Sequence, residues 1–211
     1  MLQYQTIPVT PFQQNSSLVW DDVTKQAAVI DPGGDLDLIL AHVAKHALTL
    51  EQIWLTHAHI DHILGAAFVQ RKYQAPAYLH ALDHSTWTSV ASYAHVYGFE
   101  GYQIEDVPSE AVNDHQKLNI GSFRMKVRHT PGHAPGHVVY YFEEDQFVIN
   151  GDVLFKGSFG RVDLPGGDIE ILKSSIFTIL FKYPEETVVY CGHGPETTIR
   201  QEKRTNYIHQ F

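Results

Sequence analysis

The segment Thr56-His57-Ala58-His59-Ile60-Asp61-His62 places three imidazoles and one carboxylate within six consecutive residues. The apolar run 52–56 leads into it and is typical of a short buried strand, while residues 63–73 have the pattern of a helix. Four potential metal ligands therefore stand where a strand ends and a helix begins. This arrangement indicates a metalloenzyme, because imidazole nitrogen and carboxylate oxygen suit zinc, iron or manganese without any thiolate.

The spacing of these ligands favours two neighbouring ions. In extended backbone, side chains two residues apart point the same way, so His57 and His59 can both reach one ion. Asp61 and His62 lie past the turn, at the start of the helix, and could bind a second ion close by. A histidine-rich surface turn is the simpler alternative, because the chain contains 14 histidines. Further ligand types elsewhere in the chain argue against it.

Three more potential ligands follow predicted strands. His133 lies in a loop rich in proline and glycine after the strand-like run 123–129. Asp152 and His193 each follow another short apolar run. Loops at strand ends carry the chemistry of layered α/β proteins. The sequence therefore predicts that these side chains gather at one rim of such a fold.

The order of these motifs resembles that of the metallo-β-lactamase superfamily over almost the whole chain. Residues 130–137 (T-P-G-H-x-x-G-H), 151–155 (G-D-x-L-F) and 192–194 (G-H-G) resemble hydroxyacylglutathione hydrolase, also called glyoxalase II, and its short bacterial relatives in particular. The resemblance implies an α/β fold of the four-layer αββα type, formed by a single domain over residues 1–211. Helical patterns over 35–47, 168–181 and 196–209 agree with this expectation.

The resemblance also implies a two-metal site, with zinc the first expectation and iron or manganese the alternatives. It assigns the ligands as His57, His59 and His133 on one ion, Asp61, His62 and His193 on the other, and Asp152 bridging them. Asp61 and Asp152 would act with a metal-bridging hydroxide, because two ions lower the pKa of a shared water and polarise the carbonyl that it attacks. The implied substrate is a thioester, S-D-lactoylglutathione or a related hydroxyacylglutathione.

The chain departs from full-length glyoxalase II where glutathione is bound. We expect the protein to lack the C-terminal helical domain that grips glutathione in those enzymes, so Arg161 and Lys156 become the candidate contacts for the substrate carboxylates. Pairing of Arg161 with Asp163 is an equal alternative. The element G-R-x-D at 160–163 also resembles persulfide dioxygenases, which suggests the alternative of one iron on His57, His133 and Asp152, acting on glutathione persulfide. Another hydrolase of the same fold is the remaining alternative.

Composition and the N-terminal sequence indicate which classes of partner the protein binds and in which compartment it is found. The formal net charge of -9 argues against nucleic acid, and the sequence has no run of eighteen apolar residues that would span a membrane. The N-terminus does not resemble a signal peptide, which predicts a cytoplasmic protein. We expect a monomer or small homo-oligomer. β-Lactamase activity is not expected, because zinc β-lactamases with a Cys ligand carry it where this chain has Asp152, and they are generally exported.

Several further residues are interpreted as having roles other than metal binding. His137 is interpreted as a structural neighbour of the ligands, and Cys191 as a buried apolar residue. Asp31 either orients a ligand histidine or only forms a turn. Residues 84–114 form either a substrate lid or, the preferred interpretation, a surface excursion.

Overall fold

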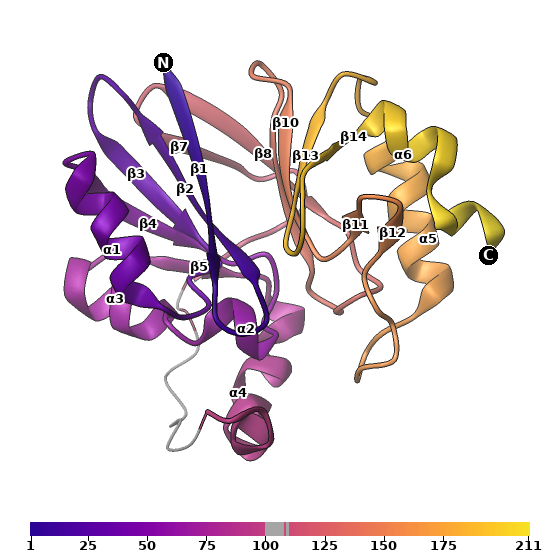
Figure 1. The fold of residues 1–211 in the computed structure, drawn as a ribbon, viewed down its shortest axis with the longest axis horizontal. Helices are drawn as coiled ribbons and strands as arrows, with labels where there is room; N and C mark the ends of the chain where they lie inside the picture. The colour runs from indigo at the N-terminus through magenta and orange to yellow at the C-terminus, as the bar shows by residue number, and fades with distance from the viewer. Residues whose placement is uncertain (100–107, 109) are drawn as a thin grey trace.

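The computed structural model describes residues 1–99, 108 and 110–211, and two β-sheets face each other at its centre. Figure 1 shows both sheets side by side with helices on their outer faces. The first sheet has the order β1-β2-β3-β4-β5-β6, antiparallel from β1 to β3 and parallel from β3 to β6. Its strands are β1 (Leu2–Val9), β2 (Gln14–Asp21), β3 (Gln26–Ile30), β4 (Thr49–Trp54), β5 (Ala77–Leu79) and β6 (Glu110–Ala111).

The second sheet has the order β14-β13-β10-β9-β8-β7, and β10 and β13 are its parallel pair. Two short strands, β11 (Leu154–Phe155) and β12 (Ser158–Phe159), form a separate ribbon directly after β10. The strands of the second sheet are β7 (Lys117–Ile120), β8 (Phe123–His129), β9 (Val138–Phe142), β10 (Phe147–Gly151), β13 (Val188–Cys191) and β14 (Thr197–Thr198).

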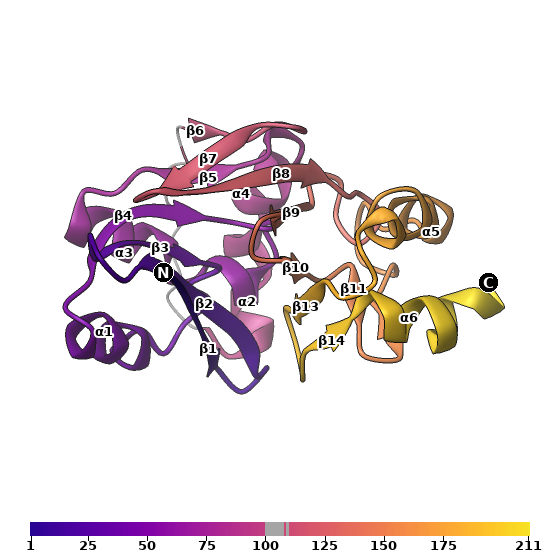
Figure 2. The ribbon, with the colours of Figure 1, turned by 90° about the horizontal axis from the view of Figure 1, so that it is seen from above.

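Helices cover the outer face of each sheet. In Figures 1 and 2, α1 and α3 lie outside the first sheet, and α5 and α6 lie outside the second. The α-helices are α1 (Leu36–Lys45), α2 (Ile60–Ile63), α3 (Ala66–Tyr73), α4 (His84–Tyr93), α5 (Ile169–Thr178) and α6 (Ile199–Thr205). The short 3-10 helices are η1 (Ala81–Asp83), η2 (Ala94–Tyr97), η3 (Leu180–Lys182) and η4 (Tyr207–Gln210).

Three apolar layers hold these four layers of structure together, because the central strands are buried on both faces. In β9, Tyr140 packs between the two sheets, and the adjacent Tyr141 packs toward the helices outside the second sheet. Trp54 of the first sheet stacks on Tyr140 with ring centroids 5.4 Å apart. The Tyr140 hydroxyl donates a hydrogen bond to the carbonyl of Leu55, so its buried polar atom is satisfied. This is the αββα sandwich that the sequence predicted, and that prediction is confirmed.

Some predicted element boundaries were wrong. The helix expected over 63–73 is two helices: α2 already begins at Ile60, and α3 begins after Gly65. A side chain at Gly65 would place its Cβ 2.6 Å from the carbonyl of Pro32, so the close approach of that loop requires glycine. The helix expected over 196–209 is interrupted, because β14 precedes α6 and Asn206 separates α6 from η4.

The segment 84–114 contains more structure than the sequence indicated. Its described part forms α4, η2 and β6. Residues 100–107 and 109 lie outside the described part of the chain, so the prediction of a lid over 84–114 falls partly on residues that are not described. Within the described residues, no helix is long and apolar enough to cross a membrane.

Candidate metal centre

Four loops at the ends of strands bring the predicted ligands together between the two sheets. The segment with His57 follows β4 of the first sheet, and the loops with His133, Asp152 and His193 follow β8, β10 and β13 of the second. Both sheets therefore contribute to one site. The ligand-type atoms form three overlapping groups, in each of which the atoms lie within 4.8 Å of one another.

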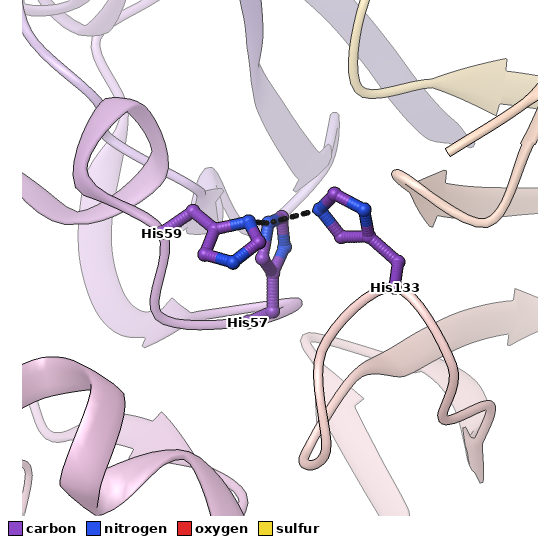
Figure 3. A group of neighbouring side chains, drawn as sticks. All are labelled: His57, His59 and His133. Carbon is purple, nitrogen blue, oxygen red and sulfur yellow. Dashed lines mark hydrogen bonds between the residues drawn. The ribbon is translucent and has the colours of Figure 1, made fainter. Parts of the chain in front are cut away.

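The first group contains three imidazoles. The Nε2 atom of His57 lies 3.0 Å from Nδ1 of His59 and 3.2 Å from Nε2 of His133. Figure 3 shows His57 and His59 on one loop and His133 reaching toward them from another. Two nitrogens bound to one tetrahedral zinc ion would be about 3.3 Å apart, given zinc–nitrogen distances of about 2.0–2.1 Å. The spacing of these nitrogens therefore fits ligands of a single ion.

The second group contains Asp61, His62 and His193. The Oδ2 atom of Asp61 lies 3.2 Å from Nε2 of His193 and 3.9 Å from Nε2 of His62. His62 is buried, whereas Asp61 and His193 are partly exposed. This group is therefore more exposed than the first, in which only His59 is partly exposed.

Asp152 forms the third group with His57 and His62, and it lies between the other two. Its Oδ1 is 3.5 Å from Nε2 of His62, and its Oδ2 is 3.6 Å from Nε2 of both His133 and His193. Asp152 Oδ1 and His62 Nε2 are buried and make no hydrogen bond to any described residue. Buried polar atoms normally have a partner, because desolvating them without one is costly. A cation between these atoms would satisfy both, so the donor set fits metal ions.

Backbone carbonyls orient two of the imidazoles. His133 donates from Nδ1 to the carbonyl of Arg161 at 2.7 Å, and His193 donates from Nδ1 to the carbonyl of Phe12 at 3.1 Å. In a neutral imidazole the other nitrogen then carries the lone pair. In both rings that nitrogen is Nε2, which faces the centre. Arg161 thus contributes to the site through its backbone carbonyl.

Asp31 orients His62, which decides between the two roles that the sequence left open. Its carboxylate accepts hydrogen bonds from the backbone N–H of Thr56 at 2.7 Å and from the Thr56 hydroxyl at 2.6 Å. Its Oδ2 also lies 2.9 Å from Nδ1 of His62. Such a carboxylate–histidine contact fixes the ring and directs Nε2 toward the centre.

The site divides into a neutral side and a proton-binding side. Burial and the neighbouring imidazoles lower the pKa of His57 well below its usual range and lower the pKa of His59 to about 3. Burial also opposes protonation of His62, but Asp152, Asp61 and Asp31 outweigh it and raise the pKa of His62 to about 10. A proton on His62 Nε2 and a cation at the same atom exclude each other, so metal binding competes with protonation there.

Two glycines allow other loops to approach Asp152. A Cβ at Gly192 would lie 2.1 Å from Oδ1 of Asp152, and a Cβ at Gly160 would lie 1.8 Å from its carbonyl oxygen. His137 lies on the other side of Asp152. Its Nε2 accepts a hydrogen bond from the backbone N–H of Asp152 at 3.0 Å, and burial keeps its pKa well below the usual range. The contact agrees with the structural interpretation of His137.

Asp83 is a buried residue of the site that sequence reasoning missed. Its carboxylate accepts hydrogen bonds from the backbone N–H of Ala58 at 2.9 Å and of Gly136 at 2.5 Å. Burial raises the pKa of Asp83 despite these bonds. Ala58 and Gly136 belong to the two loops that carry His57, His59 and His133, so Asp83 joins those loops. An isolated aspartate in a segment without a motif gives no sequence signal for this role.

The candidate substrate contacts differ from each other in position. Arg161 makes a bidentate ion pair with Asp163, at 2.7 Å and 2.6 Å, and both side chains are exposed. Arg161 lines the cavity beside the metal centre, whereas Lys156 is exposed and is not part of the cavity lining.

Cys191 is buried in the apolar layer under α5, and burial raises its pKa to about 12, in agreement with an apolar role.

Two curated proteins match this chain across almost their full lengths. A probable metallo-hydrolase of Bacillus subtilis, YqgX, is 39% identical over 207 residues, which cover 97% of this chain and 96% of that protein. The hydroxyacylglutathione hydrolase GloC of Haemophilus influenzae is 37% identical over 207 residues, which cover 97% of each protein.

Solved structures and a family model agree with these matches. BLEG-1, described as a B3 metallo-beta-lactamase, has a TM-score of 0.90 at 37% identity and covers 97% of this chain and 98% of its own. A protein solved in a di-iron-bound form has a TM-score of 0.86 at 36% identity, covering 96% and 98%. ETHE1 from Myxococcus xanthus has a TM-score of 0.81 at 27% identity, covering 97% and 83%. Residues 9–193 match the model of the Metallo-beta-lactamase superfamily, and the chain belongs to that superfamily.

Proposed function

We propose that the protein is a metal-dependent thioester hydrolase that cleaves S-D-lactoylglutathione or a related hydroxyacylglutathione. The observation that carries this proposal is the position of Asp152, whose two oxygens face both groups of ligand-type nitrogens. The proposed ligands are His57, His59 and His133 for one ion and Asp61, His62 and His193 for the other, with Asp152 shared. Similarity to the hydroxyacylglutathione hydrolase of Haemophilus influenzae supports the substrate class.

Two divalent cations bound here, zinc in the first instance, would supply a Lewis acid and a water of lowered pKa. Asp61 and Asp152 would orient the attacking water, each carboxylate accepting a hydrogen bond from one of its O–H groups. Burial alone would raise the pKa of Asp61, but His62 and His193 hold it below its usual range, so its carboxylate stays ionised. Hydrolysis joins the hydroxyl of water to the acyl carbon, breaks the carbon–sulfur bond and leaves a free thiol.

A thioester suits this site because the leaving group is a thiolate. An amine leaving group needs a proton from the protein as the bond breaks, whereas a thiolate leaves without one. Cys191, the single cysteine of the sequence, is buried and has a raised pKa, so it is no nucleophile. The proposed ligands, and the carboxylates that position the water, would supply what thioester cleavage requires.

Iron-dependent oxidation of glutathione persulfide is the second candidate. Similarity to ETHE1 from Myxococcus xanthus and to a protein solved with two irons supports it. His57, His133 and Asp152 would hold the iron in this case, and His133 lies within 3.6 Å of both partners. Similarity to BLEG-1 adds β-lactam hydrolysis as a third activity for comparison.

Variants of two proposed ligands test the main proposal. We expect His59→Ala and Asp152→Ala each to lower kcat/KM for S-D-lactoylglutathione by roughly 100-fold or more, because even residues that only orient a ligand contribute about 10–100-fold. His115→Ala is the matched control, since His115 is exposed and distant in sequence from every proposed ligand. The assay follows loss of the thioester, and the metal content of each variant is measured in parallel.

Two parallel assays distinguish the alternatives. Oxygen uptake with glutathione persulfide reports the dioxygenase, and cleavage of a chromogenic β-lactam reports lactam hydrolysis. Unchanged thioester turnover in both ligand variants, with metal still bound, would contradict the proposal. Oxygen uptake by a protein that holds one iron per chain and cleaves no thioester would establish the second candidate in its place.

A further inference from the structure

The metal centre opens into a cavity of about 600 Å³. Proposed ligands of both ions, including His59, Asp152 and His193, line one part of it. The remaining lining comes from three places: the tip of the β1–β2 hairpin, the segment from α4 to η2, and the segment from β11 to Pro165. A cavity of this size holds a small organic ligand, and the chemistry of its walls decides which ligand fits.

The first wall is aromatic and exposed. Phe12 at the hairpin tip meets Tyr97 of η2 edge to face, with ring centroids 5.8 Å apart, and Tyr93 meets Tyr97 in the same way at 6.0 Å. Phe12, Tyr97 and Val96 are 38%, 44% and 71% exposed. Adjacent apolar side chains that remain in water at the mouth of a cavity indicate a surface that a ligand covers. The carbonyl of Phe12 accepts the hydrogen bond of His193, which ties this wall to the metal centre.

The second wall is also apolar, and the C-terminal segment holds it in place. Phe155 and Phe159 line the cavity from the β11–β12 ribbon, followed by Leu164. Asn206 donates from its side-chain amide to the carbonyls of Phe155 at 3.2 Å and of Ser158 at 2.8 Å. These bonds fasten the ribbon to the end of α6, so the wall is fixed before a ligand binds.

Positive charge is scarce between these walls. Among the described residues that line the cavity, Arg161 is the one side chain with a permanent positive charge. Its Nε and Nη2 atoms are already paired with Asp163. Glutathione carries two carboxylates, so a site that recognised glutathione mainly by charge would need more cations than this. The cavity therefore provides more apolar surface for contact with the acyl group than positive charge for binding the carboxylates of glutathione.

We infer that the preferred substrate carries an apolar acyl group, an aliphatic chain or an aromatic ring, which lies between Phe12 and Tyr97 on one side and Phe155 and Phe159 on the other. This inference rests on the proposed thioester hydrolysis and specifies its substrate class. The acyl group is the part concerned, because the glutathione carboxylates stay in water or near Arg161. A lactoyl group, which is small and polar, leaves most of the apolar surface uncovered.

A series of glutathione thioesters that differ only in the acyl group tests this inference with the metal-loaded protein. The acyl groups are acetyl, lactoyl, butanoyl, hexanoyl and phenylacetyl. We expect kcat/KM to rise at least about tenfold from acetyl to hexanoyl, because each methylene group that leaves water contributes up to about fourfold. A flat or falling series, with the acetyl and lactoyl thioesters hydrolysed, would overturn the inference and leave thioester hydrolysis intact.

A binding measurement keeps the test independent of turnover. S-hexylglutathione and S-methylglutathione are thioethers without the acyl carbon that thioester hydrolysis attacks, and calorimetry gives their Kd values for the metal-loaded protein. The inference requires S-hexylglutathione to bind about tenfold more tightly or better. Equal affinities would overturn it. Absence of hydrolysis of every thioester, together with tight binding of the hexyl compound, would instead overturn the proposed function and retain the apolar site.

Variants place the effect in this cavity. We expect Tyr97→Ala to lower the ratio of hexanoyl to acetyl kcat/KM by about tenfold, and Phe155→Ala on the other wall to act in the same direction. Phe68→Ala is the matched control, because Phe68 is an exposed aromatic residue of α3 outside this cavity. Circular dichroism and metal content confirm that each variant is folded. A ratio unchanged in both wall variants, or lowered as much in Phe68→Ala, would contradict the assignment.

Discussion

At the scale of single residues, His62 and Asp152 explain why this site fits cations. Each has a buried polar atom without a hydrogen bond to the described residues. Leaving such an atom unpaired costs about 1–3 kcal/mol, and more when the group is charged. A cation between them removes that cost. The described residues of the centre therefore leave His62 Nε2 and Asp152 Oδ1 without hydrogen-bond partners.

The sequence allowed these side chains to be named because each stands beside the end of a predicted strand. Spacing within Thr56–His62 and the glycines near His133, Asp152 and His193 were sufficient to predict that they would meet. Their roles as metal ligands stay a prediction until metal is measured. Asp83 could not be predicted, because it contacts backbone atoms of Ala58 and Gly136 that become its neighbours only after folding.

Asp83 therefore provides a prediction at this scale. Asp83→Ala leaves two buried backbone N–H groups unpaired and frees the loops that carry His57 and His133, so we expect metal affinity to fall about tenfold or more. Unfolding free energy should fall by about 2 kcal/mol. Competition with a chelator measures the affinity, and urea unfolding measures the stability.

A matched control separates this role from the simple loss of an acidic residue. Asp145→Ala removes an exposed carboxylate from the turn between β9 and β10 and should change neither quantity. Asp83→Asn retains one acceptor oxygen and should give intermediate values. Unchanged metal affinity in Asp83→Ala, even with lower stability, would show that Asp83 does not position the ligand loops.

At the scale of elements, strands were easier to predict than the ends of helices. Apolar runs mark β9 and β10 because both faces of these strands are buried, whereas β8 alternates apolar and charged residues. The break between α2 and α3 depends on the contact between Gly65 and Pro32, two residues far apart in sequence. Local patterns do not contain such a contact, so the sequence predicted one continuous helix there.

Asp21 links two elements, and its titration gives a pH prediction. Hydrogen bonds from the backbone N–H groups of Val23 and Ser122 lower the pKa of Asp21 to about 2. An unfolded Asp titrates near 3.9, so the folded state binds this proton less readily. Asp21 then contributes stability that is complete above about pH 4 and is lost as pH falls through about 2.

We therefore expect Asp21→Asn to be less stable than the wild type at pH 7, with the difference shrinking as pH falls from about 4 toward 2. Urea unfolding at several pH values measures both proteins under the same metal conditions. Ser122→Ala should behave as an intermediate case, because it removes the hydroxyl donor and keeps the backbone donor. A difference between Asp21→Asn and the wild type that stays constant over this range would contradict the assignment.

At the scale of the whole molecule, the site exists because two sheets meet. His57 and Asp61 follow the first sheet, whereas His133, Asp152 and His193 follow the second. The alternating apolar layers of the sandwich fix the distance between these two sets. The motif order was sufficient to predict this architecture, whereas the walls of the cavity, built from Phe12 and the segment after α4, became visible only in the structure.

Metal stoichiometry tests the two-ion arrangement on which the proposed function depends. Elemental analysis of the purified, reconstituted protein, done on the same preparation that hydrolyses S-D-lactoylglutathione, should give two divalent ions per chain. Asp152→Ala should hold fewer ions, because it removes the carboxylate that faces both groups. A preparation that cleaves the thioester at full rate with one ion or none per chain would contradict the two-metal site.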